Sequence, residues 1–164
     1  MATTNFKGNP AHTNADLPRV GQSLSDFTLV DINLAEVNLA AYAGKKKVIS
    51  IFPSVDTGVC STAVRTFNQR AAALTNTVIL NISCDLPLAQ KRFCGAEGIE
   101  AAITLSAFRS NFPETYGVRL VDSPFKGLCA RTVIVADEHN VIRYVELVDD
   151  IVHEPNYDAA LQAL

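Results

Sequence analysis

The sequence has no tryptophan, a single methionine and no long run of apolar residues. Its apolar stretches, such as residues 132–136, are much shorter than the ~18 residues that cross a bilayer, so we expect no transmembrane helix. The N-terminal residues also lack the basic start and apolar segment of a secretory signal. These absences predict a cytoplasmic protein that does not contact membranes.

An excess of charge of one sign is missing as well. Fourteen basic and seventeen acidic side chains give a net charge of −3, and the only basic run is residues 45–47. A nucleic-acid-binding surface is therefore not expected. With 48% hydrophobic and 19% charged residues the chain is not disordered, and 164 residues suit one domain, over residues 1–164.

Paired cysteines are absent too. The four cysteines are spread over positions 60, 84, 94 and 129, and the positions three residues before and after Cys60 hold Thr57 and Ala63. A thioredoxin-like disulfide oxidoreductase needs a Cys-x-x-Cys pair, so this activity is excluded. The spacing also disfavours a structural zinc site, and the three histidines are isolated.

Strand and helix patterns alternate along the chain. Apolar and β-branched residues predict strands over 27–30, 48–52, 78–83, 103–105, 132–136 and 141–148. Gly8-Asn9 suits the turn of an N-terminal β-hairpin, and residues 137–140 suit a second hairpin connection.

Helices are expected between these strands. Apolar residues at positions 60, 64, 67, 71 and 74 share one helical face, which predicts a helix that starts near Cys60. A short helix is expected from a cap at Asp85 to a stop at Gly95, a helical turn over 113–116, and a last helix after Pro155. This order predicts a three-layer α/β domain with a central mixed sheet and helices on both faces.

Cys60 is the strongest candidate nucleophile because a loop from a central strand enters the first turn of a helix there. Free N–H groups and the positive end of the helix dipole stabilise a thiolate, which is the nucleophilic form. Pro53 fixes the exit from the strand, and Thr57 can place a hydroxyl beside the sulfur. The competing interpretation is a buried structural cysteine, since Cys60 shares the apolar face of its helix.

The residues around Cys60 resemble a known motif. Pro53-x-x-x-Thr57-x-x-Cys60 is similar to the active-site pattern of peroxiredoxins, and FPSVDTGVCSTAVRTFN resembles the thiol peroxidase (Tpx) branch of that family. Further similar segments are DLP at 85–87, RFCGAEG at 92–98, GL and AR at 127–131, and EPxY at 154–157. The resemblance covers essentially the whole chain.

This resemblance implies a thioredoxin-like fold and an antioxidant thiol peroxidase that reduces hydrogen peroxide and alkyl or lipid hydroperoxides. It implies that Cys60 is the peroxidatic cysteine and that Cys94 of the same subunit resolves it, forming a Cys60–Cys94 disulfide. It also implies that Thr57 and Arg131 complete the site and that Pro53 shields the sulfur. Thioredoxin would supply electrons to a homodimer, without a metal or cofactor.

The residues alone leave two questions open. Cys94, at the end of a short helix, and Cys84, just past a strand, are both possible resolving thiols, and only the resemblance favours Cys94. Cys84 and Cys129 are otherwise expected to be small buried hydrophobic residues, and the alternative is that they form another disulfide or react under strong oxidation. A peroxide sensor that passes its oxidation to a partner would share the chemistry of Cys60, and only turnover with a reductant would distinguish it.

Overall fold

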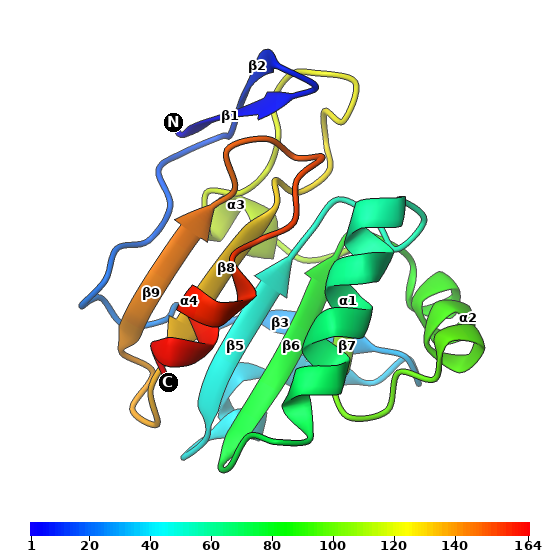
Figure 1. Cartoon of the computed structure of the whole chain (residues 1–164), viewed down its shortest axis with the longest axis vertical. Coiled ribbons are helices and arrows are strands. Elements are labelled where there is room, and N and C mark those ends of the chain that lie inside the picture. Colours follow the sequence, from blue (N-terminus) through cyan, green and yellow to red (C-terminus); the bar gives the residue numbers. More distant parts are fainter.

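The computed structural model describes all residues from 1 to 164, and a seven-stranded mixed sheet forms its centre (Figure 1). Its strands are β3 (Thr28–Asp31), β4 (Glu36–Asn38), β5 (Lys46–Ile51), β6 (Thr77–Ser83), β7 (Ile103–Ser106), β8 (Thr132–Ala136) and β9 (Ile142–Leu147). They lie in the order β4-β3-β7-β6-β5-β8-β9. The neighbours β5, β6 and β7 are parallel, whereas the remaining pairs are antiparallel, which confirms the predicted mixed sheet.

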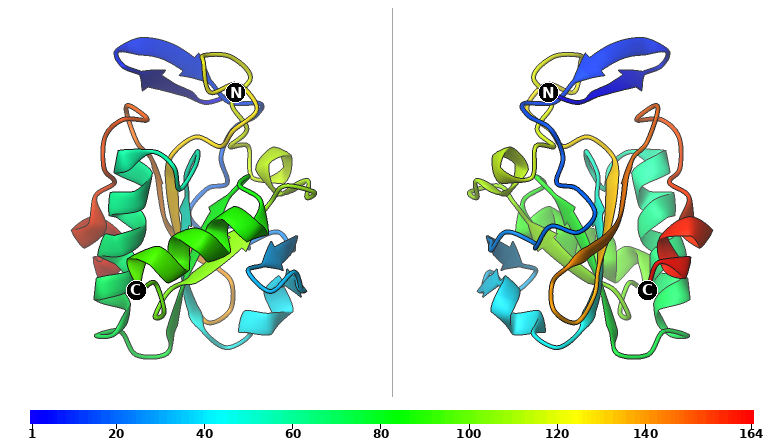
Figure 2. Two further views of the ribbon diagram at one scale, coloured as in Figure 1. Left: turned by 90° about the vertical axis from the view of Figure 1, so that its right-hand side faces the viewer. Right: turned by 90° about the vertical axis from the view of Figure 1, so that its left-hand side faces the viewer.

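Five helices accompany the sheet. They are the 3₁₀ helix η1 (Leu39–Tyr42) and the α-helices α1 (Gly58–Ala71), α2 (Pro87–Glu97), α3 (Phe112–Thr115) and α4 (Tyr157–Gln162). Figure 2 shows α1 and α4 on one face of the sheet and α3 with η1 on the other. The three-layer arrangement predicted from the sequence is therefore confirmed. No helix is both long and apolar enough to span a bilayer.

The buried strands supply both faces with apolar side chains. In β5 and the residue after it, Val48 and Phe52 pack in the cluster beneath α1, whereas Ile49 and Ile51 pack in the cluster on the opposite face. This alternation follows from the two-residue period of a strand. Because β5 lies at the middle of this buried region, the loop that follows it starts from a rigid support.

The predicted N-terminal hairpin is present as β1 (Thr3–Phe6) and β2 (Asn9–His12). Its turn consists of Lys7 and Gly8, with φ values of 52° and 81°, and Asn9 already belongs to β2. The turn is thus one residue earlier than Gly8-Asn9 suggested. The Asp150 carboxylate accepts hydrogen bonds from the backbone N–H groups of Lys7 (3.1 Å) and Gly8 (2.8 Å), which fastens the hairpin to the loop after β9.

Both expected boundaries of α2 were wrong. The residue preceding the helix is Leu86, which makes no side-chain cap, and Pro87 occupies the first turn. Pro is suited to that position because its missing N–H has no intrahelical partner there. At the other end the helix continues past Gly95 to Gly98, whose φ of 67° ends it in the left-handed region.

Candidate active site

Cys60 lies in the first turn of α1, directly after the loop that leaves β5. Thr57 is the N-cap of this helix, and its hydroxyl oxygen accepts a hydrogen bond from the Cys60 backbone N–H (3.3 Å). The same hydroxyl donates to the Ser54 carbonyl (3.3 Å), which fixes the loop and the helix start together. The Cys60 sulfur is therefore held at the positive end of the α1 dipole, where negative charge is stabilised.

Arg131, immediately before β8, contacts the sulfur directly. Its Nη2 donates to Cys60 Sγ over 3.1 Å, and its Nε donates to the Ile151 carbonyl over 3.0 Å. Both Arg131 and Cys60 are buried, with exposed fractions of 2% and 0%. A hydrogen bond from a guanidinium is charge-assisted, and it is stronger in a place with little water than at the surface. The second terminal nitrogen, Nη1, is buried without a protein partner, so it is free to donate to a bound ligand.

Asp85 is part of this site and does not cap α2 as expected. Its carboxylate accepts hydrogen bonds from Ser54 Oγ (2.7 Å) and from the Val55 N–H (2.9 Å), both in the loop before α1. Ser83 Oγ donates to the same carboxylate over 2.6 Å. The end of β6 therefore holds the loop that carries Pro53 and Thr57.

A pocket of about 340 Å³ opens beside these residues. Thr57 and Arg131 both line it, whereas Pro53, four residues before Thr57, is buried and is not part of the lining. The remaining walls are mostly apolar and come from distant segments: Phe6, Lys7, Gly58, Val59, Phe125, Ile151 and Val152. The rings of Phe6 and Phe125 lie 4.8 Å apart, so the N-terminal hairpin and the loop before β8 form one side of the pocket together.

Cys94, in α2, packs in the same buried cluster as Cys60, beneath α1. It is 7% exposed, and its thiol donates to Thr104 Oγ1 over 3.3 Å. Burial raises the pKa of the Cys94 thiol, and the Thr104 hydrogen bond opposes that shift only in part. All four cysteines are free in this structure. Cys94 is thus held as a protonated thiol on the same side of the sheet as Cys60.

Cys84 and Cys129 belong to the opposite side. Both pack in the cluster that contains Ile49 and Ile51, and their sulfurs lie 3.7 Å apart. The four cysteines therefore form two separate pairs, divided by the sheet, and do not converge as the ligands of one zinc ion.

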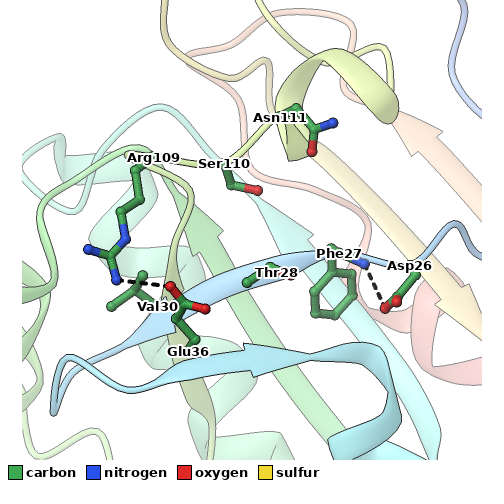
Figure 3. Close-up of a pocket in the computed structure, with 8 residues that line it drawn as sticks. All are labelled: Asp26, Phe27, Thr28, Val30, Glu36, Arg109, Ser110 and Asn111. Carbon is green, nitrogen blue, oxygen red and sulfur yellow. Dashed lines mark hydrogen bonds and ion pairs between the residues drawn. The ribbon is translucent and has the colours of Figure 1, made fainter.

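A hollow of about 470 Å³ lies away from the cysteines, between β3, β4 and the loop before α3. Figure 3 shows Arg109 extended towards Glu36 across it, and these side chains form an ion pair of 3.4 Å. No cysteine lines this hollow, which is mainly polar and separate from the Cys60 pocket.

The sequence did not assign a role in the site to four residues. Asp85 was expected to cap a helix and belonged to the similar segment DLP, although its place after a strand that neighbours β5 puts it beside the Cys60 loop. Phe6 and Phe125 carry no motif of their own. The Ile151 carbonyl, which orients Arg131, is a backbone group, so the type of residue at this position does not indicate its role.

Comparison with known proteins gives consistent results. Residues 19–161 match the family described as Redoxin. Thiol peroxidase from Corynebacterium glutamicum is 56% identical over 164 residues, covering 100% of this chain and 99% of that protein. A solved peroxiredoxin-like protein from Aquifex aeolicus is 35% identical with a TM-score of 0.93, covering 99% of this chain and 96% of that one. Thiol peroxidase from Chromobacterium violaceum, 24% identical with a TM-score of 0.90 over 98% and 93% of the two chains, shares the fold.

Proposed function

Because this chain belongs to the Redoxin family, we propose that the Cys60–Arg131 pair is the centre of its peroxide chemistry. The chain is a thiol-dependent peroxidase of the peroxiredoxin type, an oxidoreductase that reduces peroxides. The observation that supports this site most directly is the 3.1 Å hydrogen bond from Arg131 Nη2 to the fully buried Cys60 Sγ.

In the first step the Cys60 thiolate attacks one oxygen of the peroxide, and the O–O bond breaks. The second oxygen takes up a proton and leaves as water or an alcohol, while Cys60 becomes a sulfenic acid. Negative charge develops on the leaving oxygen, so preorganised donors are worth most there. Arg131 Nη1 has no protein partner and is the free donor beside the pocket. The Thr57 hydroxyl, which also belongs to the lining, can donate to the leaving oxygen by giving up its bond to the Ser54 carbonyl. Pro53 shields the sulfur from water.

In the second step Cys94 resolves the sulfenic acid. Its sulfur attacks Cys60 Sγ, water leaves, and an intramolecular Cys60–Cys94 disulfide forms. Two observations support Cys94 over Cys84: it shares the buried cluster of Cys60, whereas Cys84 packs on the other face of the sheet. Cys94 must leave its hydrogen bond to Thr104 first, so the end of α2 has to move.

The walls of the pocket favour organic hydroperoxides as substrates in addition to hydrogen peroxide. Phe6, Phe125 and Ile151 offer apolar surface to an alkyl or lipid chain, while Arg131 and Thr57 lie at its polar end. Burial of apolar substrate surface contributes roughly 25 cal/mol per Å². Thioredoxin as the reductant, a homodimeric assembly and a cytoplasmic location are proposed on the peroxiredoxin resemblance.

The experiment that tests these roles measures peroxide consumption with thioredoxin, thioredoxin reductase and NADPH. Cys60→Ser should abolish it, because a neutral hydroxyl is a poor nucleophile. Cys94→Ser should keep one rapid oxidation of Cys60 and lose repeated turnover. Cys84→Ser is the matched control for the resolving thiol and should keep its turnover. If Cys84→Ser lost turnover and Cys94→Ser kept it, the assignment of Cys94 would be overturned.

A further inference from the structure

We propose that Cys84 and Cys129 form a second redox-active dithiol, which hydroperoxide oxidises to a Cys84–Cys129 disulfide separately from Cys60 and Cys94. Their sulfurs lie 3.7 Å apart and share a hydrogen bond, whereas the sequence suggested two unrelated buried cysteines. A disulfide bond measures about 2.05 Å, so a small side-chain movement closes the gap.

The topology of the sheet places the two residues together. Cys84 follows the end of β6, and Cys129 precedes the start of β8. These strands flank β5 on either side, and Ile51 at the end of β5 pairs with Ile82 in one and Thr132 in the other. The two cysteines therefore meet across the end of β5, on the face opposite to α1.

Cys84 and Cys129 differ in exposure and in pKa, so they have different roles in the reaction. Cys84 is partly exposed, whereas Cys129 is completely buried. The hydrogen bond from Cys129 lowers the pKa of Cys84 to about 7, with a further contribution from the positive charge of Arg119. The Cys129 thiol, which donates that bond and is buried, has a raised pKa. Cys84 is thus the accessible nucleophile, and Cys129 is the thiol beside it.

Arg119 is built into this second site. It forms an antiparallel β-bridge with Cys129, and its guanidinium is fixed by the Glu114 carboxylate and the Gly127 carbonyl. A fixed cation beside a partly exposed thiolate parallels the role of Arg131 at Cys60, although Cys84 precedes the first turn of α2, whereas Cys60 lies within the first turn of α1. Oxidation of the second pair should therefore be slower than that of Cys60.

The reaction balances with the hydroperoxide that the enzyme already uses. The Cys84 thiolate attacks one peroxide oxygen, the O–O bond breaks, and the alcohol or water leaves with one proton. The Cys129 sulfur then attacks the sulfenic sulfur of Cys84, and the hydroxyl leaves as water with the second proton. In sum, two thiols and one hydroperoxide give one disulfide, one alcohol and one water.

A Cys84–Cys129 disulfide would connect two segments that position groups of the active site. Cys84 is followed by Asp85, which holds the loop before α1, and Cys129 lies two residues before Arg131. A disulfide between them would link the two strands that position these groups. Unlike the Cys60–Cys94 disulfide, it would leave the active-site thiols free to react.

A variant with Cys60→Ser and Cys94→Ser tests the proposal, because it retains only the second pair. One equivalent of cumene hydroperoxide should remove both free thiols, lower the mass by two hydrogens and give a Cys84–Cys129 cross-linked peptide. Adding Cys129→Ala should stop the reaction at a Cys84 sulfenic acid that dimedone traps, and adding Cys84→Ser should prevent oxidation. Unchanged thiols in the double variant, or disulfides only between chains, would overturn the proposal.

The unaltered chain provides a second measurement that does not depend on how variants fold. With excess hydroperoxide and rapid alkylation, peptide mapping should show the Cys60–Cys94 link first and the Cys84–Cys129 link later. If the Cys60–Cys94 disulfide forms while Cys84 and Cys129 remain alkylated, the second dithiol is refuted and the proposed peroxidase mechanism still holds. If the Cys84–Cys129 disulfide forms and the Cys60–Cys94 disulfide does not, the result would instead contradict the proposed function.

Discussion

Arg131 donates two hydrogen bonds at once, from Nη2 to the Cys60 sulfur over 3.1 Å and from Nε to the Ile151 carbonyl over 3.0 Å. The backbone contact fixes the guanidinium plane, and the other end donates to the Cys60 sulfur. Because the side chain is 2% exposed, this orientation exists before any peroxide enters the pocket. Preorganised donors of this kind contribute most to catalysis because they do not reorganise during the reaction.

Arg131→Lys should slow the reaction of Cys60 with peroxide by about 10²–10³-fold, the usual effect of removing one preorganised donor. A lysine ammonium keeps the charge but cannot satisfy both contacts with a planar fork. Stopped-flow measurement of the second-order rate constant checks this expectation. Arg143→Lys, in an exposed ion pair with Asp137, is the control and should change the rate little. Equal rates for Arg131→Lys and the unaltered chain would contradict the role of Arg131.

Thr57→Val should destabilise the protein by about 1 kcal/mol, because the helix loses its N-cap. It should also slow peroxide reduction, since the hydroxyl that faces the pocket is lost. Thr57→Ser retains the hydroxyl and should recover most of both properties. Urea unfolding and peroxidase assays of the two variants provide the comparison. Normal activity in Thr57→Val would show that the hydroxyl serves only the helix.

Asp85→Asn should lower kcat/KM while leaving the helix content unchanged. The carboxylate accepts bonds from Ser54, Val55 and Ser83, and an amide cannot accept all three because one of its ends is a donor. The loop before α1 then becomes less ordered, at a cost of about 1–3 kcal/mol for unsatisfied groups. Asp56→Asn is the matched control in the same loop, since its pairing with Arg92 is exposed and 3.5 Å long. Similar losses in both variants would contradict the specific role of Asp85.

The alkylation of Cys84 should depend on pH in a defined direction. Since its pKa is lowered to about 7, the reactive thiolate increases as pH rises from 6 to 8 and decreases below this range. In the Cys60→Ser variant, iodoacetamide labelling followed by mass spectrometry should therefore give a midpoint near pH 7. Cys129→Ala removes the hydrogen-bond donor and should move that midpoint to higher pH. An unchanged midpoint would show that Cys129 does not stabilise the Cys84 thiolate.

The parts of this structure that could be predicted from sequence are those fixed by local chemistry. The periodic apolar residues predict a helix that starts near Cys60, and α1 begins two residues earlier, at Gly58. The N-cap role of Thr57 was not predicted, although a hydroxyl beside the sulfur was. The strands of the central sheet follow from β-branched runs. The ends of α2 were missed because Asp85 suits a cap equally well, and its bonds to the loop after β5 outweigh that local preference. Gly95 is tolerated inside the helix because its packed neighbours, Phe93 and Cys94, stabilise that turn.

The remaining features depend on contacts between distant segments. The pocket needs the hairpin with Phe6 to meet Phe125, and neither residue signals the other in the sequence. Likewise the Cys84–Cys129 contact depends on β6 and β8 both neighbouring β5, which strand patterns alone do not determine. Arg131 could be assigned only by resemblance, because a residue at the start of a strand is more commonly on the surface.

The position of Cys94 within α2 has a consequence for survival at high peroxide concentration. In the proposed mechanism its sulfur leaves Thr104 when the C-terminal turns of α2 open locally, and such openings have their own free energy. Until then the Cys60 sulfenic acid is exposed to a second peroxide, which would convert it irreversibly to a sulfinic acid. A more rigid α2 would therefore give a more stable protein with a shorter working lifetime during an oxidative burst. In the proposed mechanism, the free energy of opening this helix end therefore sets how many cycles each molecule completes before it is inactivated.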